Sequence, residues 1–155
     1  MISEKIKLAS SIALFIASAG YGFAAPLYLT CQVEGREVLY LGKGYGVDDR
    51  KIGPASITVK VEDTAQYLSI DISGTRPFNN TGVFFEKNKP PTRNEYGLVT
   101  NDLFKAAGTF QQIETMIEIN RVTAQITVTE KSDMDGTQGR MNFSGFCTKM
   151  QNQKF

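Results

Sequence analysis

Hydrophobic and polar residues alternate along most of this chain, a pattern that indicates β-strands with one buried face and one solvated face. The clearest example is residues 112–130, which predict two strands joined by a tight turn at 120–123. A hairpin is only marginally stable alone in water, so its apolar face requires cover from other strands. The same alternation predicts such strands at 27–33, 36–42, 56–62, 66–73, 81–86, 96–100 and 140–148.

Glycines, prolines and polar clusters separate these segments. The pair Glu34-Gly35 predicts a hairpin turn after the first strand. Residues 101–107 follow a capping candidate, Thr100 or Asn101, and precede a glycine, which predicts one or two turns of helix. Loops are expected at 42–54, 87–94 and 131–137.

The succession of about seven to nine short strands, joined mostly by short turns, predicts an all-β antiparallel meander. An open sheet edge promotes aggregation, so such a meander closes into a barrel or folds into two layers. The first strand carries Cys31 and the last carries Cys147, and a bridge between them would place these strands side by side. We therefore expect a small closed or nearly closed barrel, with a β-sandwich as the alternative.

The first 24 residues have the three parts of an export signal. Lys5 and Lys7 supply a positive start, residues 8–19 an apolar run, and residues 22–24 a small-x-small end suited to cleavage before Ala25. This pattern predicts a signal peptide and a periplasmic or secreted location.

The alternative to cleavage is a membrane anchor formed by residues 8–24. Such an anchor needs about 20 strongly apolar residues, and serines and glycines dilute this stretch. We therefore expect a signal peptide at 1–24 and a single β domain at 25–155, with membrane attachment only if the anchor is retained.

Both cysteines lie in the mature part of the chain. In an oxidising compartment, the simplest interpretation of such a pair is a disulfide, and Cys31 and Cys147 would enclose a loop for which chain entropy gives at most about 5 kcal/mol. A redox-active pair would instead require the spacing Cys-x-x-Cys, which the sequence lacks.

Charge and composition exclude several classes of function. Residues 1–24 hold two of the 17 basic and one of the 16 acidic residues, so the mature chain is formally neutral and nothing directs it to nucleic acid. The absence of histidine excludes Ser-His-Asp and Cys-His catalysis and nearly all zinc sites. We expect no cofactor, no metal and no enzymatic activity.

Three weaker signals for chemistry have simpler explanations. Glu118 with Glu114 or Asp71 would supply paired carboxylates for a glycosidase, but all three fall on the polar face of their strands. Residues 42–46 lack the helix start that a phosphate loop needs. Residues 133–136 lack the later ligands of a calcium loop and are explained by a β-turn.

Aromatic residues gather in the middle third of the chain, which suggests a surface for a ligand or partner. Phe84 and Phe85 are adjacent, so in a regular strand they face opposite ways. We expect the outward ring to be covered by the helix, whereas an exposed ring would mark a binding surface. The candidate residues for this surface are Phe84, Phe85, Tyr96 and Phe104.

Residues 117–124, followed by 145–147, resemble a signature of small exported proteins of Gram-negative bacteria, a largely uncharacterised group. In that signature, Ile-Asp/Asn-Arg-x-Thr-Gly precedes Gly-x-Cys by some twenty residues. Ala124 stands in place of the glycine, which would strain a turn that needs a positive φ. The resemblance implies the compartment rather than the role.

Tyr28-x-x-Cys31 with Gly35 is also similar to the opening of C-type lysozyme inhibitors, which are small periplasmic barrels. Their later glycine-rich motif is absent, so no inhibitory residue is carried over.

The sequence thus predicts an exported, disulfide-bonded binding protein, either an inhibitor of a cell-wall enzyme or a carrier of a small apolar ligand. A filled interior would favour binding of a protein at the surface, and a hollow one would favour a carried ligand. The alternatives are a membrane-anchored subunit of an envelope complex and, third, a carboxylate-dependent hydrolase.

Overall fold

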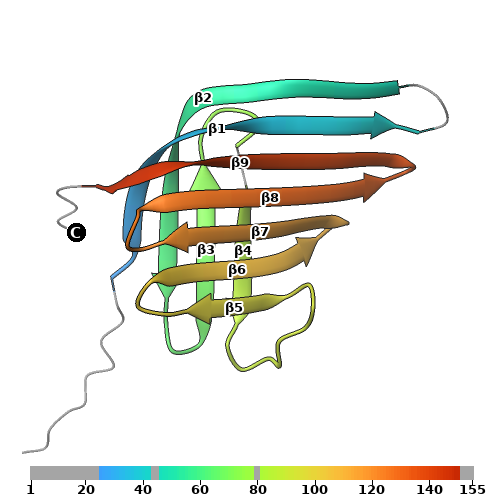
Figure 1. Cartoon of the computed structure of the whole chain (residues 1–155). Coiled ribbons are helices and arrows are strands. Elements are labelled where there is room, and N and C mark those ends of the chain that lie inside the picture. Colours follow the sequence, from blue (N-terminus) through green and yellow to red (C-terminus); the bar gives the residue numbers. More distant parts are fainter. Residues whose placement is uncertain (1–24, 43–45, 79–80, 151–155) are drawn as a thin grey trace, which may run out of the picture.

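The computed structural model describes residues 25–42, 46–78 and 81–150, which form one antiparallel sheet (Figure 1). The sheet order is β4-β3-β2-β1-β9-β8-β7-β6-β5, so the first and last strands of the chain are neighbours. The strands are β1 (Leu27–Leu41), β2 (Gly46–Asp63), β3 (Tyr67–Ser73), β4 (Thr81–Glu86), β5 (Tyr96–Val99), β6 (Leu103–Phe110), β7 (Ile113–Asn120), β8 (Gln125–Met134) and β9 (Thr137–Lys149). The predicted all-β antiparallel meander is confirmed.

The sheet curls into a nearly closed barrel. Strands β3 and β4, with the part of β2 that pairs with β3, form a covering layer that runs crosswise behind the main layer of β5–β9 and β1 (Figure 1). The side chain of Val83 on β4 packs onto Gly108 of β6, and the ring of Phe85 packs onto Gly97 of β5. The edge strands β4 and β5 do not pair with each other, so one side of the barrel stays open.

The core lies between the two layers. Apolar side chains from alternating positions of both layers fill it, and the rings of Phe78 and Phe143 meet edge to face with centroids 4.6 Å apart. Its largest fully buried side chains are Phe78, Ile57, Leu68, Ile70, Ile117, Ile126, Val59, Val128 and Cys31.

The ribbon of β1, β2 and β9 bends where the chain passes from one layer to the other. Opposite Glu34, β2 carries two residues, Gly53 and Pro54, which form a bulge. A Cβ on Gly145 of β9 would lie 1.8 Å from the carbonyl oxygen of Gln32 on β1, so the two backbones approach too closely for any side chain at that position. The bend therefore depends on glycine.

The predicted turn at Glu34-Gly35 and the loop at 42–54 are wrong. Strand β1 runs on through Gly35, and β2 already begins at Gly46. The missed part of the ribbon has both faces exposed, so it shows no apolar alternation. Ion pairs join its strands instead, between Arg36 and Asp49 and between Arg50 and Glu37. The loop predicted at 131–137 is likewise shorter, because β8 continues to Met134.

The helix predicted at 101–107 is also wrong, because this segment begins β6. Phe104 and Ala106 point into the core, and the strand pairs with β7 over its whole length. The hydroxyl of Thr100 accepts a hydrogen bond from the N–H of Asp102 at 3.3 Å, so the capping candidate stabilises the tight β5–β6 turn. Pairing with β7 thus overrides a weak local preference for helix.

The predicted disulfide between Cys31 and Cys147 is confirmed. The two residues lie directly opposite each other on β1 and β9, with Cα atoms 3.9 Å apart, and both are buried. Within the described residues, no helix is long and apolar enough to cross a membrane.

Removal of this disulfide should destabilise the fold. The double variant Cys31→Ala/Cys147→Ala frees a loop of 116 residues in the unfolded chain, and we expect it to lose about 2–5 kcal/mol of unfolding free energy. Urea unfolding of the variant, compared with reduced and oxidised wild-type protein, measures this loss. Equal midpoints for oxidised wild type and the variant would contradict the prediction.

The β7–β8 turn explains the residues of the exported-protein signature structurally. The side-chain oxygen of Asn120 accepts hydrogen bonds from the N–H groups of Val122 and Thr123, at 2.9 and 2.8 Å. Arg121 donates to the carbonyl of Thr100 at 2.7 Å. Ala124 has a φ of 58°, in the left-handed region that favours glycine.

Ala124→Gly should therefore stabilise the protein by about 1 kcal/mol, because it removes the cost of a side chain in the left-handed region. Val122→Gly, in the same exposed turn, is the matched control and should give no gain. Thermal and urea unfolding of both variants test the prediction. A loss of stability in Ala124→Gly would show that the positive φ carries no strain.

Candidate functional site

The adjacent rings of Phe84 and Phe85 do face opposite ways on β4. Phe85 is 9% exposed and packs inside the barrel, whereas Phe84 is 59% exposed on the outside and stacks at 5.1 Å on Tyr67 of β3. The expected cover over the outward ring is wrong, because the helix that would have supplied it is a strand. Phe84 is therefore an exposed aromatic residue on an edge strand.

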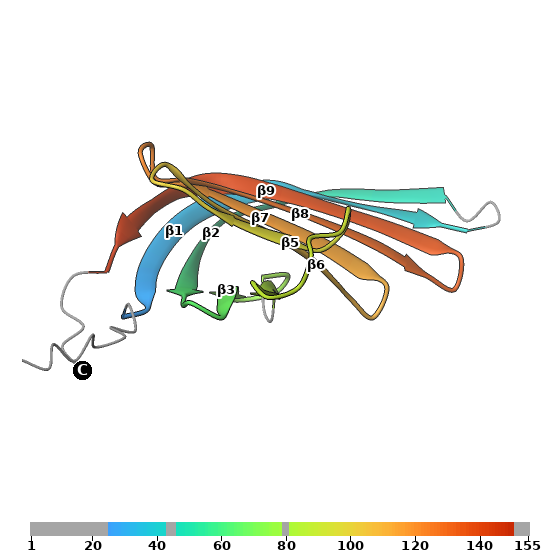
Figure 2. The same ribbon diagram turned by 90° about the horizontal axis from the view of Figure 1, so that it is seen from below.

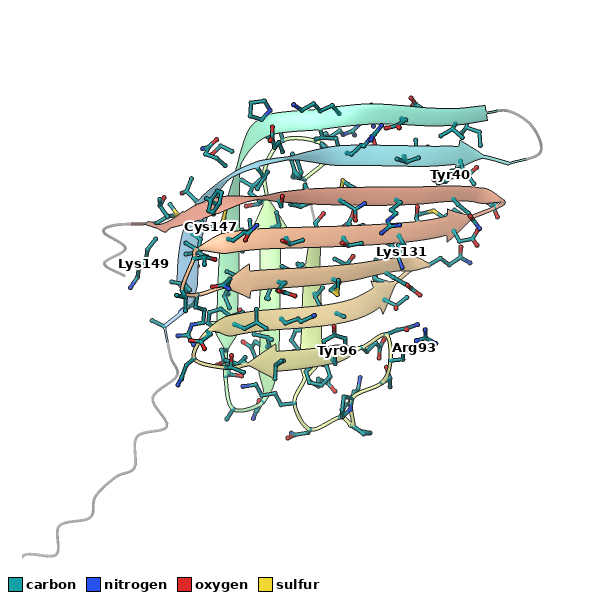
Figure 3. All side chains as sticks on the ribbon, in the orientation of Figure 1. Tyr40, Arg93, Tyr96, Lys131, Cys147 and Lys149 are labelled. Carbon is teal, nitrogen blue, oxygen red and sulfur yellow. A yellow bond between two sulfur atoms is a disulfide. The ribbon has the colours of Figure 1, made fainter. Side chains whose placement is uncertain are left out.

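Tyr96 and Phe104 lie apart from Phe84. Tyr96 projects from the outer face of β5, where its hydroxyl lies 3.6 Å from the sulfur of Met116 (Figure 3). Phe104 is 6% exposed inside the barrel, with the guanidinium of Arg121 4.6 Å from its ring centroid. The four predicted aromatic residues therefore do not form one surface.

The outer face of the main layer is polar. Tyr96 lines an open groove of about 500 Å³ there, together with Arg93, Glu114 and Lys131 (Figure 3). Glu118, the leading carboxylate candidate, forms an ion pair at 3.1 Å with Lys105 on β6. This face has the mixed charges of an ordinary solvated surface.

A different surface stands out where the main layer extends beyond the covering layer. The hairpins β1–β2, β6–β7 and β8–β9 continue past β3 and β4, which leaves the inner face of their ends uncovered (Figure 2). One row on this face runs from Phe110 through Ile113, Ser132 and Gly139 to Leu39. We call this inner face, from that row to Leu41 and Met134 at the strand ends, the open shelf.

The open shelf exposes large apolar side chains. Phe110 is 74% exposed, Leu41 and Met134 are exposed as well, and Leu39 and Ile113 are half-buried. Isolated exposed apolar residues are common on proteins, but a group of them on one concave face marks an interaction surface.

Two hollows lie along the open shelf, and the larger of them lies where the shelf meets β4. The larger, about 600 Å³, has Thr81–Phe84 on one side and Gly108–Phe110 on the other. The smaller, about 140 Å³, is lined by Leu39, Ile113 and Met134 among others. β4 thus forms one wall of the larger groove, and Gly108–Phe110 of β6, at the edge of the open shelf, form the other.

The larger groove is acidic. Its lining includes Asp71 and Glu95, and neither lysine nor arginine. Asp71 reaches the groove across Gly82, which has no side chain to block it: a Cβ there would lie 3.0 Å from the Asp71 carboxylate. The groove therefore favours a ligand with positive charge.

Glu130 lies in the second row of the inner face, between Thr115 of β7 and Met141 of β9. Burial raises the pKa of this carboxyl above its ordinary value of 4.5, while hydrogen bonds from Thr81 and Thr115 partly offset the rise. Thr81 belongs to β4, so Glu130 forms a polar link between the layers at the base of the open shelf.

The raised pKa predicts a pH-dependent cost in stability. Between 4.5 and the higher folded pKa, the folded protein binds more protons than the unfolded chain, so Glu130 destabilises the fold as the pH rises through this window. The unfolding free energy of Glu130→Gln minus that of wild type should therefore increase as the pH rises from 4 to 8. Urea midpoints across this range measure the difference, and parallel curves for the two proteins would contradict it.

Sequence reasoning missed the open shelf. Leu39 and Ile113 lie in predicted strands and Met134 in a predicted loop, and no local pattern distinguishes them from their neighbours. The usable signal is strand length: β8 and β9 have 10 and 13 residues, while β3 and β4 have 7 and 6. Shorter strands cannot cover longer ones completely.

Comparison with protein families, with curated proteins and with solved structures finds no match to this chain. In the described residues, no cluster of three or more histidine, cysteine or acidic side chains is arranged to hold a metal ion. The open shelf and the groove beside β4 are therefore the features of this chain that bear on its function.

Proposed function

We propose that this chain is an exported, non-catalytic binding protein that takes a partner protein at the open shelf. The observation that carries the proposal is the position of Phe84 and Phe110, two exposed rings on opposite sides of one groove. Aromatic residues in a concave, partly desolvated setting supply much of the affinity at protein interfaces. Inhibition of a cell-wall enzyme is the most specific form of this function.

The filled interior favours a partner at the surface over a carried ligand. Phe78 and Phe143 close the space between the layers, and the side chains around them are almost completely buried. A small apolar molecule inside the barrel would have to displace this packing, at a cost of several kcal/mol.

One further observation supports a location outside the cytosol. The buried disulfide is typical of proteins in oxidising compartments. The export signal predicted at 1–24, and with it the alternative of an anchor, lies outside the described residues. The carboxylate of Glu118 is held in an ion pair with Lys105, which gives no support to Glu118 as a catalytic acid.

The inhibitor form is tested by titrating the exported protein against lysozymes in a cell-wall lysis assay. We expect inhibition by wild type and at least about tenfold weaker inhibition by Phe110→Ser, since loss of one anchoring ring typically costs more than 1 kcal/mol. Phe146→Ser is the matched control: Phe146 is 66% exposed on the outer face of β9, away from the open shelf.

Full lysozyme activity at saturating protein would eliminate the inhibitor form. Equal effects of Phe110→Ser and Phe146→Ser would show that inhibition does not use the open shelf.

A further inference from the structure

The backbone of β4 has one unpaired side. The N–H of Lys87 donates to the carbonyl of Gln66 at 2.8 Å, so these two residues form a hydrogen-bonded pair. In an antiparallel ladder, every second pair is hydrogen-bonded, so this pair shows which of the β3–β4 pairs are. Counting back by two along β4, Phe85, Val83 and Thr81 form the hydrogen-bonded pairs with β3. Gly82 and Phe84 therefore turn their N–H and C=O groups to the side on which β4 has no strand neighbour.

This edge lacks the usual protection against strand pairing. Natural sheets protect an edge with lysine, proline, a bulge or a very short strand. The sequence of β4 is Thr-Gly-Val-Phe-Phe-Glu, and its register with β3 is uninterrupted. The opposite edge, β5, has only four residues. An unprotected edge of six residues beside an open groove is typical of a site for strand addition.

We propose that an extended segment of a partner protein, rich in apolar residues and carrying lysine or arginine, pairs with β4 as an additional strand. This inference rests on the proposed function, because the added strand would lie on the open shelf. Its residues alternate in direction, so one set meets the shelf at Phe110 and Ile113. The other set lies beside Phe84 on the outer face.

The charge of the groove selects the occupant. Asp71 and Glu95 are the two charged residues of its lining. Lys60 lies opposite Asp71 on β2, but its ion pair is with Glu62, so a cation in the added strand gains attraction from both lining carboxylates. A second copy of this chain would bring another β4, whose only charged residue is Glu86. Pairing of two β4 strands would therefore add negative charge to an acidic groove, which disfavours a homodimer through this edge.

The test uses two fluorescein-labelled decapeptides, one of alternating lysine and valine and one of alternating glutamate and valine, with binding followed by fluorescence anisotropy. We expect the lysine peptide to bind wild type at least tenfold more tightly than the glutamate peptide. The variant Asp71→Asn/Glu95→Gln should reduce this preference at least fivefold. An equal affinity for both peptides would overturn the assignment of a cationic occupant.

The role of the backbone is isolated by Phe84→Ala and Phe84→Pro. Both lose the ring, but only proline removes the N–H that faces the groove, and that N–H is not used by β3. We expect Phe84→Pro to bind the lysine peptide about tenfold more weakly than Phe84→Ala, with urea midpoints confirming that both variants fold. Equal affinities would overturn strand addition.

Hydrogen exchange in wild type provides a second readout that needs no variant. On addition of the lysine peptide, the amides of Gly82 and Phe84 should gain protection, while those of Val83 and Phe85, already paired with β3, change little. No gain at Gly82 and Phe84 would overturn the proposal. A wild-type dimer in sedimentation that Phe84→Pro dissociates would identify a second copy as the occupant and overturn it as well.

The two proposals fail separately. If Phe110→Ser abolishes inhibition of the enzyme while Phe84→Pro behaves as Phe84→Ala, the open shelf binds a partner without strand addition. If Phe84→Pro loses the peptide while wild type leaves the enzyme fully active, the edge binds extended peptides and the inhibitor form of the proposed function is wrong.

Discussion

The close approach of β1 and β9 is the constraint on which the rest of the fold depends. Gly145 lets the two backbones meet with no side chain between them, and the disulfide between Cys31 and Cys147 fixes the strands two residue pairs further along. At the same level, the bulge at Gly53 and Pro54 increases the bend of β2. Without this bend, β3 and β4 would extend a flat sheet instead of covering it. The apolar faces of both layers would then remain in water.

The sequence predicted the fold wherever one face of a strand is buried and the other is wet. Residues 56–62 and 112–130 alternate strictly because their two faces have different environments. The prediction failed at Gly46–Lys51, where both faces are exposed and the strand depends on backbone pairing and ion pairs with β1. It failed again at Leu103–Phe110, because the stabilising partner, β7, is distant from the local helix signals. Gly35 and the pair Gly53-Pro54 do interrupt regular strand structure, as the sequence suggests. They allow a bend within a continuous strand, however, and not a turn between two strands.

The candidate site was predictable only in its most local part. Two adjacent phenylalanines in a strand require one outward ring, and Phe84 is that ring. The open shelf has no local signature, because its residues continue the same alternation as the core. Phe110 and Met134 are exposed only because β4 is shorter than the strands it covers, a relation between segments that are distant in the chain. Exposure of this kind follows from topology and is not encoded in any one strand.

The gap beside β4 persists although the chain order offers a simple way to close it. Strands β4 and β5 are consecutive, so a hairpin between them would complete the barrel. The connection prevents this: Pro90 and Pro91 supply no N–H donors, and the N–H of Thr92 donates to the carbonyl of Glu95 at 2.9 Å in a local turn. Glu95 also returns a hydrogen bond from its N–H to the hydroxyl of Thr92. These local bonds shape a connection that does not pair with β4. The open edge is therefore a property built into residues 87–95, and its unpaired groups remain available to a strand from another protein.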